Sequence, residues 1–245
     1  MKLAVKEIKF GFKKYNISYE ILNQNNQKDI VFLHGWGANK EIMKKAFGSK
    51  FSEFRHIYVD LPGFGKSSIH SAINTKDYAK IISRFLKEIN STKDIVVGHS
   101  FGGKVGVLLN PNTLVLLSSA GIVVKKRIIV RLKIAIFKFF KMLGFGFLYK
   151  LFASKDVAGM SKEMYETLKK VVDEDYSPYF GAYKGRALIF WGKEDRTTPL
   201  KCGERINSLI KNSELFALSG DHFFFLLHGE FINNVVLSDC TQSHF

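Results

Sequence analysis

The chain has 245 residues, of which 46% are hydrophobic and 24% charged, values typical of a globular protein of one domain or one domain with an insertion. The net charge of +15 would suit a nucleic-acid partner, but the lysines are scattered and no nucleic-acid-binding motif occurs, so none is expected. The cysteines, Cys202 and Cys240, are too few for a disulfide framework and lie too far apart for a metal site, which favours a reducing compartment.

The chain begins with alternating segments and continues with apolar strands and helices. Residues 2–12 and 14–22 predict an antiparallel ribbon. Lysines interrupt the first residues too often for a signal peptide, so we expect a cytoplasmic protein. Further strands are expected within 29–37, 55–65, 94–100, 112–121, 185–192 and 213–220, and further helices at 40–50, 76–90, 101–109, 200–211 and 222–238.

Continuous apolar strands that alternate with helices predict an α/β fold, with a mostly parallel central sheet covered by helices on both faces. Ligands of such sheets bind beyond the carboxyl ends of the strands. The candidate motifs of this sequence lie at such ends.

The segment 121–184 interrupts the alternation, because it contains no convincing strand. We expect a helical lid here, inserted between two parts of the core, 1–120 and 185–245. Its apolar stretch 128–148 contains too many cations to cross a membrane, so no transmembrane segment is expected. The lid helices are expected near 125–143, 146–155 and 160–173.

A serine lies between two glycines in "VVGHSFGG", residues 96–103. A nucleophilic serine needs a sharp turn between a strand and a helix, where neighbouring side chains would clash. Gly98 and Gly102 have no side chains and so avoid those clashes. A strand is expected before the motif and a helix after it. Ser100 is therefore the candidate nucleophile.

A nucleophilic serine needs a base, and the base needs an acid that orients it. His222 follows the last predicted strand and is the expected base. Asp195, in "WGKEDRTTPL" after the strand 185–192, is the expected acid, with Glu194 and Asp221 as alternatives. The chain order Ser100, Asp195, His222 is the order in which such residues occur on this type of α/β fold.

A tetrahedral oxyanion needs two N–H donors. The N–H of Phe101, at the start of a predicted helix, is one candidate. The N–H of Trp36, in "HGWG" (34–37), is the other.

With these residues in place, the chain resembles the α/β-hydrolase superfamily over essentially its whole length, including "DLPGFGKSS" (60–68). It is most similar to lidded bacterial serine carboxylesterases, and "HGWG" with "DLPGFGKS" is similar to pimeloyl-acyl-carrier-protein methyl ester esterases. It departs from the latter at His99, where they often have tryptophan. Ser100 argues against epoxide hydrolases and haloalkane dehalogenases, whose nucleophile is aspartate.

The resemblance implies a serine hydrolase that cleaves a carboxylic ester through an acyl-enzyme, without cofactor or metal. Two alternatives stay open: a carbon–carbon bond hydrolase with the same residues, and a catalytically silent fold that binds a ligand. "GFGKSS" is not a phosphate-binding loop, because Asp60 stands where that motif needs its first glycine. A lid rich in Phe and Ile suits a small-molecule ester with an apolar acyl part, although core packing would use the same residues.

Four cations of the predicted lid, Arg127, Arg131, Lys138 and Lys141, fall on one face of a helix at 100° per residue. Such a face suits solvent in a lysine-rich protein. It would equally suit an acidic carrier protein that delivers the substrate, or an anionic membrane surface.

Overall fold

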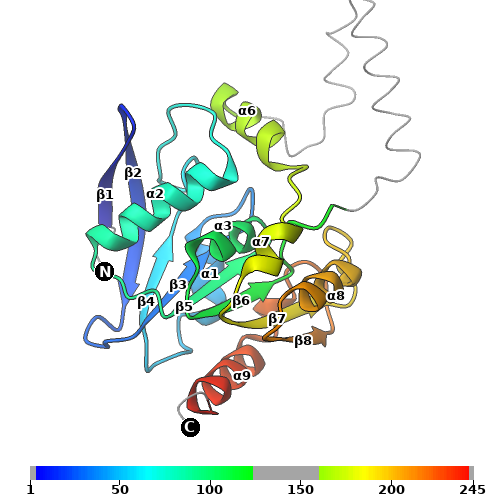
Figure 1. Cartoon of the computed structure of the whole chain (residues 1–245). Coiled ribbons are helices and arrows are strands. Elements are labelled where there is room, and N and C mark those ends of the chain that lie inside the picture. Colours follow the sequence, from blue (N-terminus) through cyan, green and yellow to red (C-terminus); the bar gives the residue numbers. More distant parts are fainter. Residues whose placement is uncertain (1–3, 124–159, 243–245) are drawn as a thin grey trace, which may run out of the picture.

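The computed structural model describes residues 4–123 and 160–242, and an eight-stranded sheet forms its centre (Figure 1). The strand order is β1-β2-β4-β3-β5-β6-β7-β8. The strands are β1 (Ala4–Phe10), β2 (Lys13–Leu22), β3 (Asp29–Leu33), β4 (Arg55–Val59), β5 (Ile95–His99), β6 (Thr113–Leu117), β7 (Arg186–Gly192) and β8 (Ser213–Leu218). The helices are α1 (Lys40–Phe47), α2 (Thr75–Glu88), α3 (Phe101–Leu109), α6 (Lys162–Val171), α7 (Ser177–Ala182), α8 (Leu200–Leu209), the short 3-10 helix η3 (Phe224–Leu226) and α9 (Gly229–Gln242).

The sheet is mostly parallel, as predicted. The ribbon of β1 and β2 is antiparallel and joins the rest through an antiparallel pairing of β2 with β4. From β4 to β8 every pairing is parallel. The carboxyl ends of these parallel strands therefore lie at one edge of the sheet.

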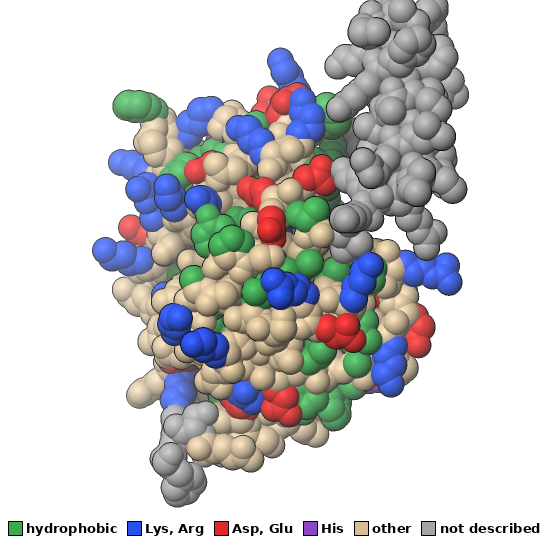
Figure 2. Space-filling view, turned by 45° about the vertical axis from the view of Figure 1, so that its right-hand side comes forward, with side chains coloured by type: hydrophobic (Ala, Val, Ile, Leu, Met, Phe, Trp, Pro, Cys, Tyr) green, Lys and Arg blue, Asp and Glu red, His purple; other side chains and the backbone are tan. Residues whose placement is uncertain are grey.

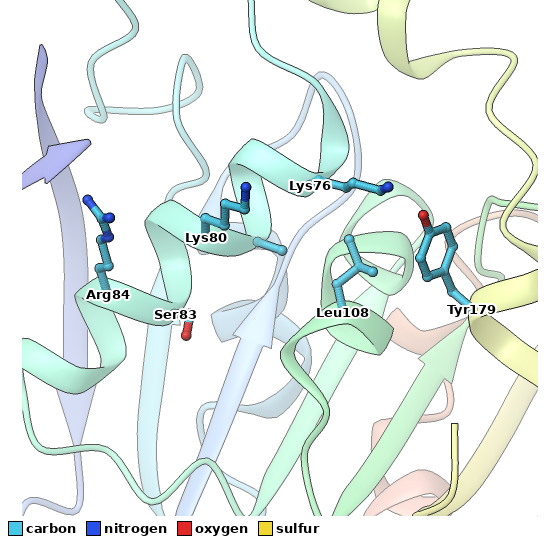
Figure 3. A pocket seen from close by; sticks show the side chains of 7 residues that line it. Lys76, Lys80, Ser83, Arg84, Leu108 and Tyr179 are labelled. Atoms are coloured by element: carbon cyan, nitrogen blue, oxygen red, sulfur yellow. The ribbon is translucent and has the colours of Figure 1, made fainter. Parts of the chain in front are cut away.

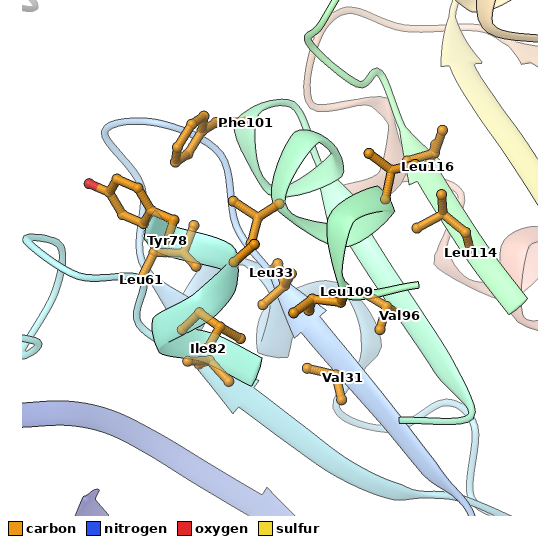
Figure 4. Packing of buried hydrophobic residues seen from close by; sticks show 14 of the residues in the cluster. Val31, Leu33, Leu61, Tyr78, Ile82, Val96, Phe101, Leu109, Leu114 and Leu116 are labelled. Atoms are coloured by element: carbon orange, nitrogen blue, oxygen red, sulfur yellow. The ribbon is translucent and has the colours of Figure 1, made fainter. Parts of the chain in front are cut away.

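Alternate residues of the central strands face two hydrophobic layers. Val31 and Leu33 of β3 face the layer formed with α2, α3, α7 and α8, part of which Figure 4 shows. Ile30 and Phe32 face the layer formed with α1, η3 and α9. Both faces are covered, so β3 is buried along its whole length, which explains why its sequence is apolar from Ile30 to Leu33.

The last predicted helix, 222–238, was wrong at its start. The structure has η3 at Phe224–Leu226 and begins α9 only at Gly229. Phe224 and Phe225 are fully buried against the second layer, so the apolar run is explained by packing rather than by helix periodicity. His222 consequently lies in a loop.

The predicted lid falls partly outside the described residues, including the helices expected near 125–143 and 146–155. The helix expected at 160–173 is present as α6, where Thr167 Oγ1 accepts the Ile73 N–H at 3.2 Å. The short helix α7 was not predicted. Its Phe180 is fully buried in the first layer, so α7 packs on the core.

Lysines lie both on the surface and in the interior. Figure 2 shows Lys and Arg side chains spread over one face with Asp and Glu among them. Lys40 and Lys104, however, are buried and paired with Asp60 and Glu174. In the part of the chain that the structure describes, no helix has the length and apolarity needed to cross a membrane.

Candidate active site

Four loops at the carboxyl edge of the sheet carry the predicted site residues. Ser100 directly follows β5, and Trp36 follows β3. Asp195 and His222 follow β7 and β8. Because these strands are parallel members of one sheet, residues scattered over most of the sequence meet at one edge.

Ser100 occupies a strained turn between β5 and α3. Its φ of 50° and ψ of −112° lie in a region that costs a non-glycine residue about 1–3 kcal/mol. A Cβ at Gly98 would stand 2.6 Å from the carbonyl oxygen of Gly102, and one at Gly102 would stand 2.3 Å from that of Leu33. The two glycines thus permit the close approach of strand and helix that the turn requires, as the motif predicted.

Asp195 and His222 are joined by a hydrogen bond. The Nδ1 of His222 lies 2.7 Å from Oδ2 of Asp195. Burial raises the pKa of Asp195, but the hydrogen bonds from His222 and Thr198 outweigh it and hold that pKa at about 2. The carboxylate is therefore ionised at neutral pH, and it fixes the proton of His222 on Nδ1, which leaves Nε2 free to accept one.

In the described part of the chain, no hydrogen bond joins the side chains of Ser100 and His222; the bonds of the His222 side chain go to Asp195 and Thr198. His99, the residue before Ser100, links the two loops, because its Nε2 lies 3.0 Å from the carbonyl oxygen of His222. Ser100 itself is half-buried.

The alternative acids, and the further histidine His228, bond other groups. Glu194 is exposed and accepts the N–H of Gly220. Asp221 is exposed and accepts the N–H of Phe223 at 2.8 Å. His228 is bonded to Ser219, with Nε2 at 2.8 Å from the Ser219 carbonyl. Of these acids, only Asp195 bonds His222 in the described structure.

The two predicted oxyanion donors flank Ser100. Phe101 is the first residue of α3, and N–H groups in the first turn of a helix have no acceptor within that helix. Trp36 belongs to the loop after β3, and its indole ring packs edge-on against Phe101 with centroids 5.5 Å apart. A Cβ built on Gly35 would lie 3.1 Å from Cβ of Ser100, so this loop adjoins the serine.

Buried polar groups hold the loop after β3 in place. His34 Nε2 accepts the Leu61 N–H at 3.0 Å, and its Nδ1 lies 2.8 Å from the Gly35 carbonyl oxygen. Burial lowers the pKa of His34 to about 4, so the ring is neutral at pH 7. Asp60 accepts the backbone N–H and the Nζ of Lys40 at 2.8 and 2.7 Å. The sequence indicated a glycine-rich turn here, but it did not indicate the buried hydrogen bonds that hold the turn.

Thr198 is a site residue that sequence reasoning missed. Its Oγ1 lies 2.8 Å from Oδ2 of Asp195 and 3.3 Å from Nδ1 of His222, and its N–H donates to Oδ1 of Asp195. The same hydroxyl is 3.1 Å from the carbonyl oxygen of Ser118. A threonine three residues after an acidic residue was the available signal, since such residues commonly bond each other in turns.

A separate groove of about 420 Å³ lies along α2 (Figure 3). Its lining includes Leu108 of α3, and Lys76 of α2 points toward the ring of Tyr179 in α7, with Nζ 5.4 Å from the ring centroid. The groove contains none of the predicted site residues: it is lined by Lys76, Ala79, Lys80, Ser83, Arg84, Leu108 and Tyr179.

Comparison with known sequences finds hydrolases among the proteins similar to this chain. Residues 29–109 match the family described as alpha/beta hydrolase fold. The chain is 24% identical to the uncharacterized hydrolase YugF of Bacillus subtilis, over 86% of this chain and 88% of that protein. It is 34% identical to a pimeloyl-[acyl-carrier protein] methyl ester esterase of Photorhabdus laumondii, over 34% of this chain and 30% of that protein.

Comparison with solved structures finds the same architecture. A thermophilic esterase from Thermogutta terrifontis superimposes with a TM-score of 0.76 at 16% identity, over 99% of this chain and 100% of that one. At this identity the likeness concerns the fold.

Proposed function

Because the chain has the α/β-hydrolase fold, we propose that it is a serine hydrolase that cleaves carboxylic esters. The observation that carries the proposal is the hydrogen bond between Asp195 and His222, at 2.7 Å, beside the strained turn of Ser100. A buried, ionised carboxylate on Nδ1 is what a histidine base needs. A purely structural loop would not require a strained serine at the same edge.

The proposed reaction has two halves. In the first, Ser100 Oγ attacks the acyl carbon, and His222 Nε2 accepts the hydroxyl proton and passes it to the leaving alcohol as the ester C–O bond breaks. In the second, His222 takes a proton from water, the hydroxide attacks the acyl-enzyme, and the serine leaves with the proton. Asp195 stays ionised throughout and stabilises the imidazolium.

The N–H groups of Trp36 and Phe101 are the proposed donors to the oxyanion. Removal of one such donor typically costs about 10²–10³ in kcat. Both groups are backbone donors, so side-chain substitutions would not remove them. The N-terminal end of α3 adds its partial positive charge at the same point.

The proposed substrate is an ester with an apolar acyl group. Trp36 packs edge-on against Phe64 and Phe101, with centroids 4.9 and 5.5 Å apart, and this aromatic group adjoins Ser100. Such rings bind hydrocarbon better than charged acyl groups. The partial match to a pimeloyl-[acyl-carrier protein] methyl ester esterase supports the same class.

The test is hydrolysis of p-nitrophenyl esters of increasing acyl length, from acetate to decanoate. The wild-type protein should hydrolyse them, and Ser100→Ala should lower kcat by several orders of magnitude because the acyl-enzyme cannot form. Ser208→Ala, at an exposed position of α8, is the matched control and should match the wild type. Equal activity in Ser100→Ala and wild type would refute the mechanism. Cleavage only of a dienoic diketone would favour the carbon–carbon alternative, and no cleavage at all the silent fold.

We also propose an acidic carrier protein as the source of the substrate. This rests on the predicted basic face of Arg127, Arg131, Lys138 and Lys141, which lies outside the described residues. Gln at all four positions should lower kcat/KM for a carrier-linked ester and spare a free ester, with a loss that shrinks as salt rises. An equal response of both esters would contradict docking through this face.

A further inference from the structure

His99 lies against the catalytic loop that carries His222. Its side chain is buried, with 1% of its surface exposed. Its Nε2 is 3.0 Å from the carbonyl oxygen of His222, and because a carbonyl only accepts, Nε2 carries the proton and donates it. The rings of the two histidines also touch, with centroids 4.7 Å apart.

This arrangement leaves one polar atom of His99 without a partner. With the proton on Nε2, Nδ1 is an acceptor, and in the described structure it is buried and bonds nothing. It faces Gly35, where an added Cβ would stand 2.9 Å away. A buried unpaired acceptor is costly, and a phenyl ring would fill the same space without that cost. Packing alone therefore does not explain a histidine here.

His99 also holds the residues that follow His222. Its ring contacts those of Phe223 and Phe225, with centroids 5.4 and 4.7 Å apart. The loop is otherwise a short turn ahead of η3, in which Asp221 O accepts the Phe224 N–H at 3.1 Å. The bond from His99 thus links the base's own backbone to the residue next to the nucleophile.

We propose that His99 is a positioning residue: through the bond from its Nε2–H to the His222 carbonyl, it holds the base in register with Ser100. The inference rests on the proposed function of Ser100 and His222. His99 is buried and acts through His222. It stays neutral while it does so, because burial and the nearby His222 lower the pKa of His99 to about 3.

Two variants separate the hydrogen bond from the packing. His99→Phe keeps a ring and loses the donor, and His99→Gln keeps an N–H donor at the position of Nε2. With p-nitrophenyl butyrate, we expect His99→Phe to lower kcat about tenfold or more with KM little changed, since small displacements of a catalytic group cost one to two orders of magnitude. His99→Gln should recover most of that loss. Full activity in His99→Phe, or equal losses in both variants, would overturn the proposal.

A second measurement is independent of turnover. In protein labelled with ¹⁵N-histidine, the ring signals of His222 should shift in His99→Phe and return toward their wild-type positions in His99→Gln. His56→Phe is the matched control, because His56 is equally buried but bonds Phe51 and Tyr58, and it should leave the His222 signals in place. Unchanged His222 signals in His99→Phe would refute the positioning role. Absence of ester hydrolysis in the wild type would instead refute the proposed function.

Discussion

At the scale of single residues, Asp195 differs from the two alternative acids, Glu194 and Asp221, by what surrounds its carboxylate. It is 5% exposed and accepts the N–H groups of Thr197 and Thr198 at 2.8 and 2.9 Å. Its other oxygen meets His222 and the Thr198 hydroxyl. These bonds orient the carboxylate and keep it ionised, whereas Glu194 and Asp221 are exposed.

The first prediction concerns this acid. Asp195→Asn should lower kcat by a factor on the order of 10⁴, because the amide no longer holds the proton of His222 on Nδ1. Glu194→Gln is the matched control, one residue away in the same turn, and should cost less than about threefold. Steady-state hydrolysis of a p-nitrophenyl ester gives both values. A larger loss in Glu194→Gln or Asp221→Asn would show that the acid is assigned wrongly.

The second prediction concerns the pH dependence of stability. The pKa of Asp195 is lowered to about 2, against about 3.9 for a free aspartate, so its ionised form stabilises the folded state above about pH 4 and that contribution disappears as the pH falls through about 2. Urea unfolding of the wild type and Asp195→Asn at several pH values measures the difference. The wild type's advantage should shrink on acidification. An advantage that grows toward low pH would contradict the lowered pKa.

At the scale of elements, helix α2 begins with a capping box formed by two residues close together in the sequence. Asn74 Oδ1 accepts the Asp77 N–H at 3.0 Å, and Asp77 Oδ2 accepts the Asn74 N–H at 3.1 Å, a reciprocal capping box. One face of the helix buries Tyr78, Ile82 and Phe85 against the sheet. The apolar spacing explains why this helix was predictable to within two residues, and the cap explains where it begins.

The third prediction follows from that cap. Asn74→Ala should lower the free energy of unfolding by about 1 kcal/mol, because the first turn loses an acceptor. Asn74→Ser keeps a capping oxygen and should lose only a few tenths of a kcal/mol. Urea denaturation followed by circular dichroism measures both. Equal losses in the two variants would mean that the side-chain bond does not stabilise the helix.

Other elements could not be placed from the sequence. The residues 223–227 are all apolar, and such a run is equally compatible with a helix and with a buried turn. Only the packing of Phe224 and Phe225 against α1 and β7 favours the turn. The short helix α7 spans six residues with Pro178 in its first turn, too few for a periodic pattern.

At the scale of the whole molecule, the sheet was predictable because each buried strand is a continuous apolar run between turn residues. β5, β6 and β7 became recognisable in this way, and parallel pairing follows from the helices between them. The candidate site was predictable because its residues directly follow strands. The contact between His99 and His222 was not predictable, since it depends on how two distant loops pack. Thr198 carried only the local signal of its spacing from Asp195.

Covalent labelling of Ser100 tests the central claim most directly. A fluorophosphonate should react with one equivalent of wild-type protein, abolish ester hydrolysis, and appear by peptide mass spectrometry on Ser100. Only a serine activated by a neighbouring base reacts readily with such a reagent. Ser100→Ala should remain unlabelled, and Ser208→Ala should be labelled like the wild type. Labelling at another residue, or none in folded wild-type protein, would contradict the account.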